Sequence, residues 1–193
     1  MDRYHVALYI HFLSLLIGIG AASVLIVCAF QLRAARTLAD AGPWGRVAAK
    51  VGRMFPIAIL GLFASGAYMT SQDFWTWDAG WIEVGIGALV VLAIQGPVLA
   101  ERSGKKVAQA LMANGPGELR GDALRKTRYL PLWWAEMSAI GLVLGVIWNM
   151  TTKAGLGSSI AAAVGGYAVG VALALLCTRQ PSTEATPATE PTA

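Results

Sequence analysis

The two histidines of the chain, His5 and His11, are candidates for metal binding or proton transfer. Imidazole binds copper and haem iron, and it exchanges protons near neutral pH. Six residues turn an α-helix by about 600°, so the two side chains point about 120° apart and cannot share one iron. His11 falls on a helical stripe with Ala7, Ser14 and Gly18, whereas His5 falls among large apolar residues. We therefore expect His11 to face neighbouring helices, either as a ligand or proton relay or as a neutral residue hydrogen-bonded to another helix.

Glu83 and Met150 extend this candidate site. Glu83 shares a helical stripe with Gly80 and Gly87, which predicts that it points inward at a depth similar to that of His11. A histidine–carboxylate pair suits the surroundings of a metal or a proton site, and it is equally a simple hydrogen bond between helices. The thioether of Met150 suits copper or haem iron, although methionine is also a common packing residue. The candidate cofactor-binding residues are thus His11 and Glu83, and the candidate metal ligands are His11 and Met150.

One charged residue, Glu136, lies within residues 129–152. A charge inside an apolar segment is costly unless it is neutralised. A nearby basic residue, Arg128 or Arg53, can neutralise it, and we predict a structural ion pair between Glu136 and Arg128 near the cytoplasmic end, with proton transfer as the alternative. Cys28 and Cys177 approach the same end, where a reducing compartment keeps thiols free. The sequence contains no P-loop, CxxC, HExxH, dinucleotide-binding glycine pattern or G-x-S-x-G, and it establishes no enzymatic activity.

The elements that carry these residues follow from composition. Of the 193 residues, 56% are hydrophobic and 13% are charged, and the mean hydropathy is +0.58. An average soluble domain is about 25% charged, so this composition excludes an ordinary soluble domain, a disordered chain and a disulfide scaffold. We predict an all-α, polytopic membrane protein, a bundle of five transmembrane helices. The five helices are expected at about 5–32, 54–71, 81–100, 131–150 and 155–178.

The predicted domain organisation is simple. Residues 1–178 form a single transmembrane domain, and residues 179–193, rich in Pro, Thr, Glu and Ala, form a disordered cytoplasmic tail. Within loop 101–130, residues 105–113 are expected to form a short amphipathic helix that ends at the Asn-Gly-Pro-Gly sequence of residues 114–117.

Positive charge is concentrated in two loops, 33–53 and 101–130, which hold 12 of the 15 lysines and arginines. By the positive-inside rule both loops are cytoplasmic. This places the N-terminus outside and the C-terminus in the cytoplasm of a multi-pass protein of the bacterial plasma (inner) membrane. The net charge of +4 is therefore a signal of topology, and we expect no nucleic-acid binding.

Each predicted helix has a face of small residues, and two of them carry a GxxxG pattern, at residues 141–145 and 166–170. In lipid, small residues allow helix backbones to approach closely. Such faces hold one chain together, or they bind a second copy or another subunit of a membrane protein complex. The sequence leaves both readings open.

Three stretches together resemble a known group: residues 9–20 (YIHFLSLLIGIG), residues 61–68 (GLFASGAY) with 80–82 (GWI), and residues 149–153 (NMTTK). They are similar to uncharacterised bacterial families of predicted integral membrane proteins related to the copper-resistance D (CopD) membrane domain. The resemblance covers about residues 4–160. It implies a helical membrane domain with a histidine, here His11, near the start of helix one, followed by a Gly-rich turn.

A more distant resemblance is to the J-type protoporphyrinogen oxidases, which place a haem-linked histidine where His11 stands. The chain has Gly85 where that family has a lysine, and it lacks the tryptophan that usually follows the helix-one histidine. The proline expected after Lys153 in the CopD-like group is Ala154. These differences argue against oxidase activity and leave a haem or copper site at His11.

We therefore expect an integral plasma-membrane protein of the CopD-like group that holds haem or copper in its outer half through His11. The alternatives are a non-catalytic accessory or scaffold subunit of a larger membrane complex, and a small transporter.

Overall fold

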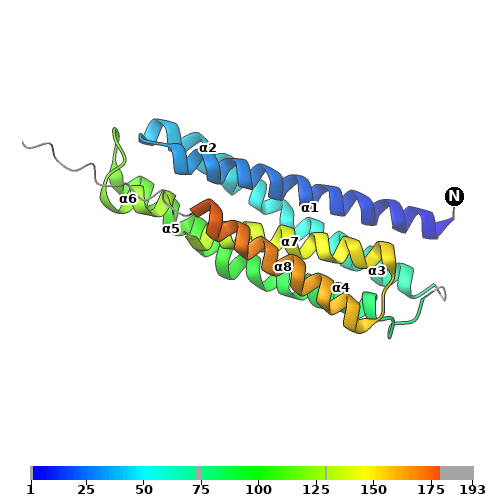
Figure 1. The fold of residues 1–193 in the computed structure, drawn as a ribbon. Helices are drawn as coiled ribbons and strands as arrows, with labels where there is room; N and C mark the ends of the chain where they lie inside the picture. Colours follow the sequence, from blue (N-terminus) through cyan, green and yellow to red (C-terminus); the bar gives the residue numbers. More distant parts are fainter. Residues whose placement is uncertain (1, 73–74, 129, 179–193) are drawn as a thin grey trace, which may run out of the picture.

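The structure is a computed structural model that describes residues 2–72, 75–128 and 130–178. Its elements follow one another as a set of long and short helices (Figure 1). They are α1 (Arg3–Ala34), α2 (Leu38–Val51), η1 (Gly52–Met54), α3 (Phe55–Thr70), α4 (Gly80–Gln95), η2 (Gly96–Glu101), α5 (Arg102–Asn114), α6 (Gly121–Thr127), α7 (Leu130–Thr152) and α8 (Leu156–Thr178). No strand occurs within the described ranges.

Five helical stretches are long and apolar enough to cross a membrane, which confirms the predicted all-α fold with five spans. They cover Arg3–Ala34, Leu38–Thr70, Gly80–Asn114, Gly121–Thr152 and Leu156–Thr178. The second and third continue beyond the predicted spans because η1 and η2 join neighbouring helices without a break. In η2, Pro97 lacks the N–H that an α-helix needs, and the backbone widens to a π-helical turn. The predicted tail, residues 179–193, lies outside the described residues.

The distribution of side chains reverses that of a soluble protein. Buried positions are mostly small or polar, whereas large apolar residues cover the outside of the helices. Leu16 and Leu60 are each 68% exposed, and Ile57 is 66% exposed. Such a surface is stable only when hydrocarbon covers it. The protein is therefore a multi-pass membrane protein whose apolar surface meets the lipid bilayer.

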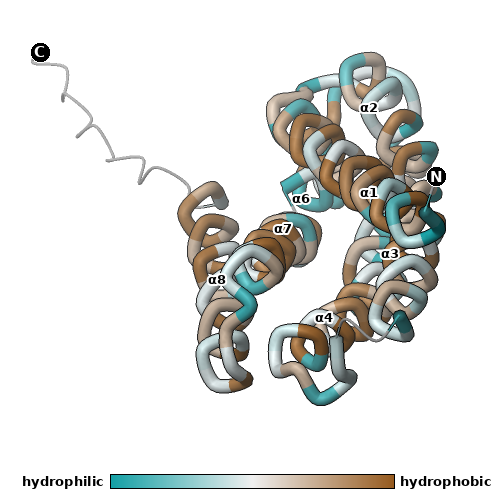
Figure 2. The backbone as a smooth tube through the Cα atoms, turned by 90° about the vertical axis from the view of Figure 1, so that its right-hand side faces the viewer, coloured by the Kyte–Doolittle hydropathy of each residue, from teal (hydrophilic) through white to brown (hydrophobic). Residues whose placement is uncertain are grey.

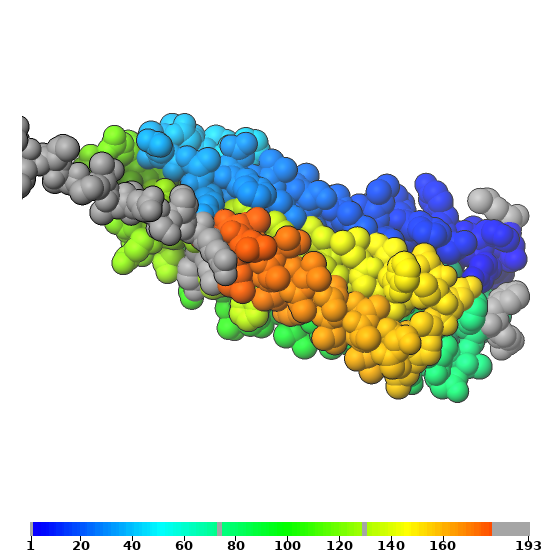
Figure 3. Space-filling model, in the orientation of Figure 1, coloured from blue at the N-terminus to red at the C-terminus, as the bar shows by residue number. Residues whose placement is uncertain are grey.

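The two C-terminal helices, α7 and α8, pack antiparallel through their GxxxG patterns. A Cβ atom added to Gly141 would overlap the Gly166 carbonyl, and one added to Gly145 would overlap the Ala162 carbonyl. A Cβ atom added to Gly170 would overlap the Met137 carbonyl. Both glycine faces are thus occupied within the chain. Figure 3 shows α8 lying against α7 along the length of the molecule.

A second pair, α1 and α3, packs by the same principle (Figure 2). Gly61 on α3 leaves room for the side chain of Ser14 on α1, and Gly18 on α1 faces Ala58 on α3. The predicted stripe of Ala7, His11, Ser14 and Gly18 does face this neighbour. The α4 helix packs against α7 and α8 and also contacts α3.

The two basic loops of the sequence are largely helical and pack together at one end of the bundle (Figure 1). We call this part the head: α2, α5, α6 and the end of α1. Its core contains Leu32, Ala41, Val107 and Leu119, and it is closed by a hydrogen bond from the Leu119 N–H to the Arg36 carbonyl, 2.7 Å long. The predicted amphipathic helix 105–113 is confirmed as part of α5. By contrast, the sequence analysis assigned no helix to 38–51, which forms α2.

Substitution of Gly166 by alanine tests the α7–α8 contact, and Gly165→Ala is a matched control one residue away. A Cβ atom on Gly166 would overlap the Gly141 carbonyl, whereas one on Gly165 meets nothing within 4 Å. Both changes gain about 1 kcal/mol of helix propensity, but overpacking costs about 1–3 kcal/mol. We expect Gly166→Ala to lower the thermal unfolding midpoint in detergent and Gly165→Ala to leave it unchanged or raise it. Equal effects would contradict close packing at these glycines.

Candidate functional site

His11 lies at the α1–α3 contact and is 9% exposed. Its Nδ1 atom is 3.1 Å from the hydroxyl oxygen of Ser65 on α3. Gly66, the next residue of α3, has no side chain, and a Cβ atom there would lie 3.5 Å from the His11 ring. Local helix geometry thus brings the serine and the glycine of the GLFASGAY stretch against the imidazole. The expectation that His11 faces another helix is confirmed.

The hydrogen bonds around Ser65 determine which ring nitrogen of His11 carries the proton. The Ser65 hydroxyl donates to the Gly61 carbonyl at 2.5 Å, so its proton is already used. With its proton on that carbonyl, the Ser65 oxygen accepts from the ring, and this arrangement assigns the ring proton to Nδ1. In a neutral imidazole this leaves a lone pair on Nε2. His11 is held in the tautomer that binds a metal or accepts a proton through Nε2.

Glu83 does not join His11. It lies in the first turn of α4 and is exposed, as is Gly87 one turn later. The buried face of α4 instead carries Ile82, Ala88 and Gln95. The expectation that Glu83 points inward is therefore wrong. Of the two glycines on the same helical stripe, Gly80 does contact α8, but only at the end of the helix.

No group of three His, Cys, Asp or Glu side chains capable of holding a metal occurs within the described parts of the chain. Met150 lies half-buried near the end of α7. Beside it, Asn149 is almost fully buried and donates through Nδ2 to the Ser159 carbonyl at 2.9 Å. Among the described residues no contact joins Met150 to His11, so the metal-ligand pair stays a prediction.

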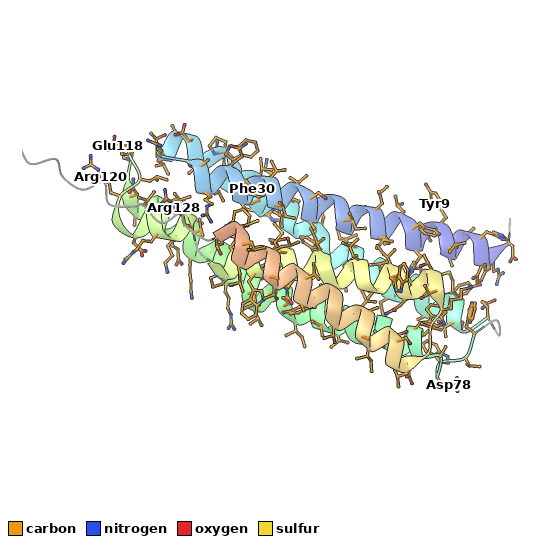
Figure 4. The ribbon with its side chains drawn as sticks, in the orientation of Figure 1. Tyr9, Phe30, Asp78, Glu118, Arg120 and Arg128 are labelled. Atoms are coloured by element: carbon orange, nitrogen blue, oxygen red, sulfur yellow. The ribbon has the colours of Figure 1, made fainter. Side chains whose placement is uncertain are left out.

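Glu136 lies on α7, where it is 6% exposed and close enough to Cys28 of α1 for the two groups to interact electrostatically. Arg128 is exposed and forms no ion pair with it. The structure does not bring these two predicted partners together, because α6 ends at Thr127 and Arg128 stands in the turn before α7. Figure 4 shows Arg128 near Glu118 and Arg120 at the head end of the molecule.

Arg33, near the end of α1, contacts Trp133, which lies one turn before Glu136 on α7. Its guanidinium reaches the Thr178 carbonyl at 3.5 Å and lies 6.0 Å from the centre of the Trp133 ring. Trp133 itself is fully buried and meets Phe30 edge-on. Arg33 therefore stabilises the C-terminal end of α8, where helix carbonyls lack partners within the helix.

Two amide side chains tie helices of the bundle together, a role that the sequence did not lead us to expect. Gln95 of α4 donates to the Ala135 carbonyl at 2.8 Å and to Ser138 Oγ at 2.9 Å, which ties α4 to α7. Asn149 ties the ends of α7 and α8 in the same way. The available signal was an amide within an apolar run.

The end of the bundle opposite the head is closed by aromatic contacts. The Nζ atom of Lys153 lies 4.2 Å from the centre of the Trp75 ring, and Trp75 meets Trp81 edge-on. Lys153 adopts a left-handed backbone conformation, with φ of 50°, which turns the chain from α7 into α8. This contact fixes the loop between α3 and α4 against the turn between α7 and α8.

The two buried ionisable groups, His11 and Glu136, belong to different sites. Glu136 lies near Cys28, which follows His11 by 17 residues on α1, a rise of about 25 Å along the helix axis. His11 thus lies toward the end opposite the head, whereas Glu136 lies toward the head. No single ligand of modest size touches both.

Comparison of the chain with protein-family models, curated proteins and solved structures finds no match.

Substitution of Ser65 by alanine tests how the imidazole is held. The change removes the hydroxyl acceptor of the buried His11 ring, which we expect to destabilise the protein by about 1–2 kcal/mol. Ser23→Ala is the matched control, because Ser23 is exposed and its hydroxyl bonds only to the Ile19 carbonyl of its own helix. The control should stay within about 0.5 kcal/mol of wild type. Nitrogen-15 NMR should detect the Nδ1–H tautomer of His11 in wild type and its loss in Ser65→Ala; an unchanged tautomer would contradict the assignment.

Proposed function

We propose that the protein is a multi-pass protein of the bacterial inner membrane that binds a transition metal, as haem iron or copper, through His11. The single observation that supports this is the hydrogen-bond chain from His11 through Ser65 to the Gly61 carbonyl. A metal-binding histidine almost always donates its second ring N–H to a fixed acceptor, which sets the tautomer and the ring orientation. Ser65 supplies that acceptor.

The donor set at His11 favours haem over a copper ion held by protein ligands alone. The described residues provide no three-residue group of His, Cys, Asp and Glu. A bare ion takes several ligands from the protein, whereas haem brings four nitrogens and needs one axial imidazole. Haem bound at this position would supply one-electron redox chemistry. The chain's own contribution is to orient the imidazole and keep Nε2 unprotonated.

We also propose that the head is cytoplasmic and that the N-terminus lies outside. This orientation rests on the basic residues of residues 33–53 and 101–130, which gather at the head. His11 then lies in the outer half of the membrane and Glu136 in the inner half.

Single cysteines at the two ends test the orientation. Asp78 and Glu118 are exposed at opposite ends of the molecule (Figure 4). In intact cells, a membrane-impermeant maleimide should label Asp78→Cys and should label Glu118→Cys only after permeabilisation. The wild-type chain gives the background, because Cys28 is buried and Cys177 half-buried. The reverse labelling pattern would overturn the proposed orientation.

Visible spectroscopy and metal analysis of one sample test the proposed ligand. We expect the protein, purified in mild detergent from its native membrane, to show a haem Soret band or near-stoichiometric copper. The signal should disappear in His11→Ala and persist in His5→Ala, because His5 is exposed on the other side of α1. The His11→Ala protein is checked for folding by circular dichroism.

Two outcomes would refute the metal site. One is a bound metal or haem that stays unchanged in His11→Ala. The other is a colourless, metal-free wild-type protein that purifies with a stoichiometric partner, which would identify an accessory subunit with His11 as a packing residue.

A further inference from the structure

Glu136 is a buried acid without a compensating partner. Its side chain is 94% removed from solvent, since 6% remains exposed. No hydrogen bond or ion pair to it occurs within the described part of the chain. The titratable side chain that reaches it electrostatically is Cys28, from α1. A thiol cannot neutralise a carboxylate.

The basic residues near the head do not neutralise the carboxyl group of Glu136. Arg33 is directed to the Thr178 carbonyl and the Trp133 ring, and Arg128 is exposed. On α4, the polar residue that faces α7 is Gln95, which is neutral and already bonded to Ala135 and Ser138. On α8, Cys177 packs near Trp133 and is neutral as a free thiol. None of these groups supplies a positive charge to the carboxyl group.

A buried polar atom without a hydrogen-bond partner lies one turn away from Glu136 on the same helix. Trp133 is fully buried, and its Nε1 atom has no hydrogen-bond partner among the described residues. Residues three apart on a helix share a face. A donor and an acid without partners on one buried face mark a place for a small hydrogen-bonding species such as water.

An ionised carboxylate in this setting would be strongly unfavourable. Transfer of an unpaired charge into a low-dielectric interior costs so much that the group takes up a proton instead. Acidic residues within membrane helices that keep no cation are therefore typical of proton-binding positions.

We propose that Glu136 is a proton-binding site in the half of the bundle nearest the head, where it is held as a neutral carboxylic acid at neutral pH. The proton comes from water and returns to water, with no other reactant. The site is independent of metal binding at His11, because Cys28, the α1 residue near Glu136, lies about 25 Å from His11 along the helix at 1.5 Å per residue.

Chemical labelling tests the protonation state directly. A lipophilic carbodiimide adds to a protonated carboxyl group inside hydrocarbon and leaves a stable N-acylurea that mass spectrometry locates. Glu83, which is exposed, is the control within the same molecule. We expect Glu136 to carry the adduct at about pH 7, because a buried carboxyl group without a partner holds its proton, and the exposed Glu83 to carry little of it. Absence of the adduct on Glu136, or equal labelling of the two residues, would overturn the proposal.

The isosteric variant Glu136→Gln gives a second readout that does not depend on reagent access. A group that holds its proton more tightly in the folded state makes the folded protein less stable as pH rises, because the unfolded chain ionises more readily. We expect the unfolding midpoint of wild type in detergent to fall relative to that of Glu136→Gln between about pH 5 and about pH 7. Glu83→Gln is the control and should follow wild type. Identical pH dependence of wild type and Glu136→Gln would refute the proton site whatever the labelling shows.

Discussion

The close approach of helix backbones is the constraint on which the rest of this structure depends. Apolar side chains gain little by leaving lipid for one another, so helices in a bilayer associate through van der Waals contact between surfaces that fit. Gly141 and Gly145 on α7 meet the backbone of α8 around Gly166, with no space for a side chain between them. Gly61 plays the same part between α3 and Ser14 of α1. The large apolar residues are consequently left for the lipid-facing surface.

Small residues at these contacts also place polar side chains within reach of a neighbouring helix. His11 meets Ser65 where Gly61 and Gly66 keep α3 close to α1. Gln95 reaches both a carbonyl and a hydroxyl of α7 in the same manner. Each of these bonds satisfies a polar group that hydrocarbon would leave unpaired, and each fixes the orientation of a side chain.

The two ionisable groups inside the bundle differ in how far the chain satisfies them. His11 has a defined acceptor on one nitrogen and is thereby prepared to use the other. Glu136 is buried and has no partner within the described residues. Uptake of a proton is therefore the simplest way to neutralise its carboxyl group. His11 and Glu136 lie toward opposite ends of the bundle, so each position can carry its own chemistry without contact with the other. The head, with its own small apolar core, joins the ends of α1, α3 and α4 on the side nearer Glu136.

The sequence by itself determined the number of spans, the small-residue faces, the inward direction of His11 and the amphipathic helix at 105–113. These properties depend on composition and on the angular position of residues along one helix, which sequence contains directly. The tertiary structure decided that Ser65 is the partner of His11, that the two GxxxG faces occupy each other, and that Glu136 and Arg128 stay apart. Those outcomes depend on the register and crossing of helices distant in the chain. A stripe on one helix states that a face is buried, but it does not state which neighbour covers it or how far along the helix that neighbour reaches, as the exposure of Glu83 illustrates.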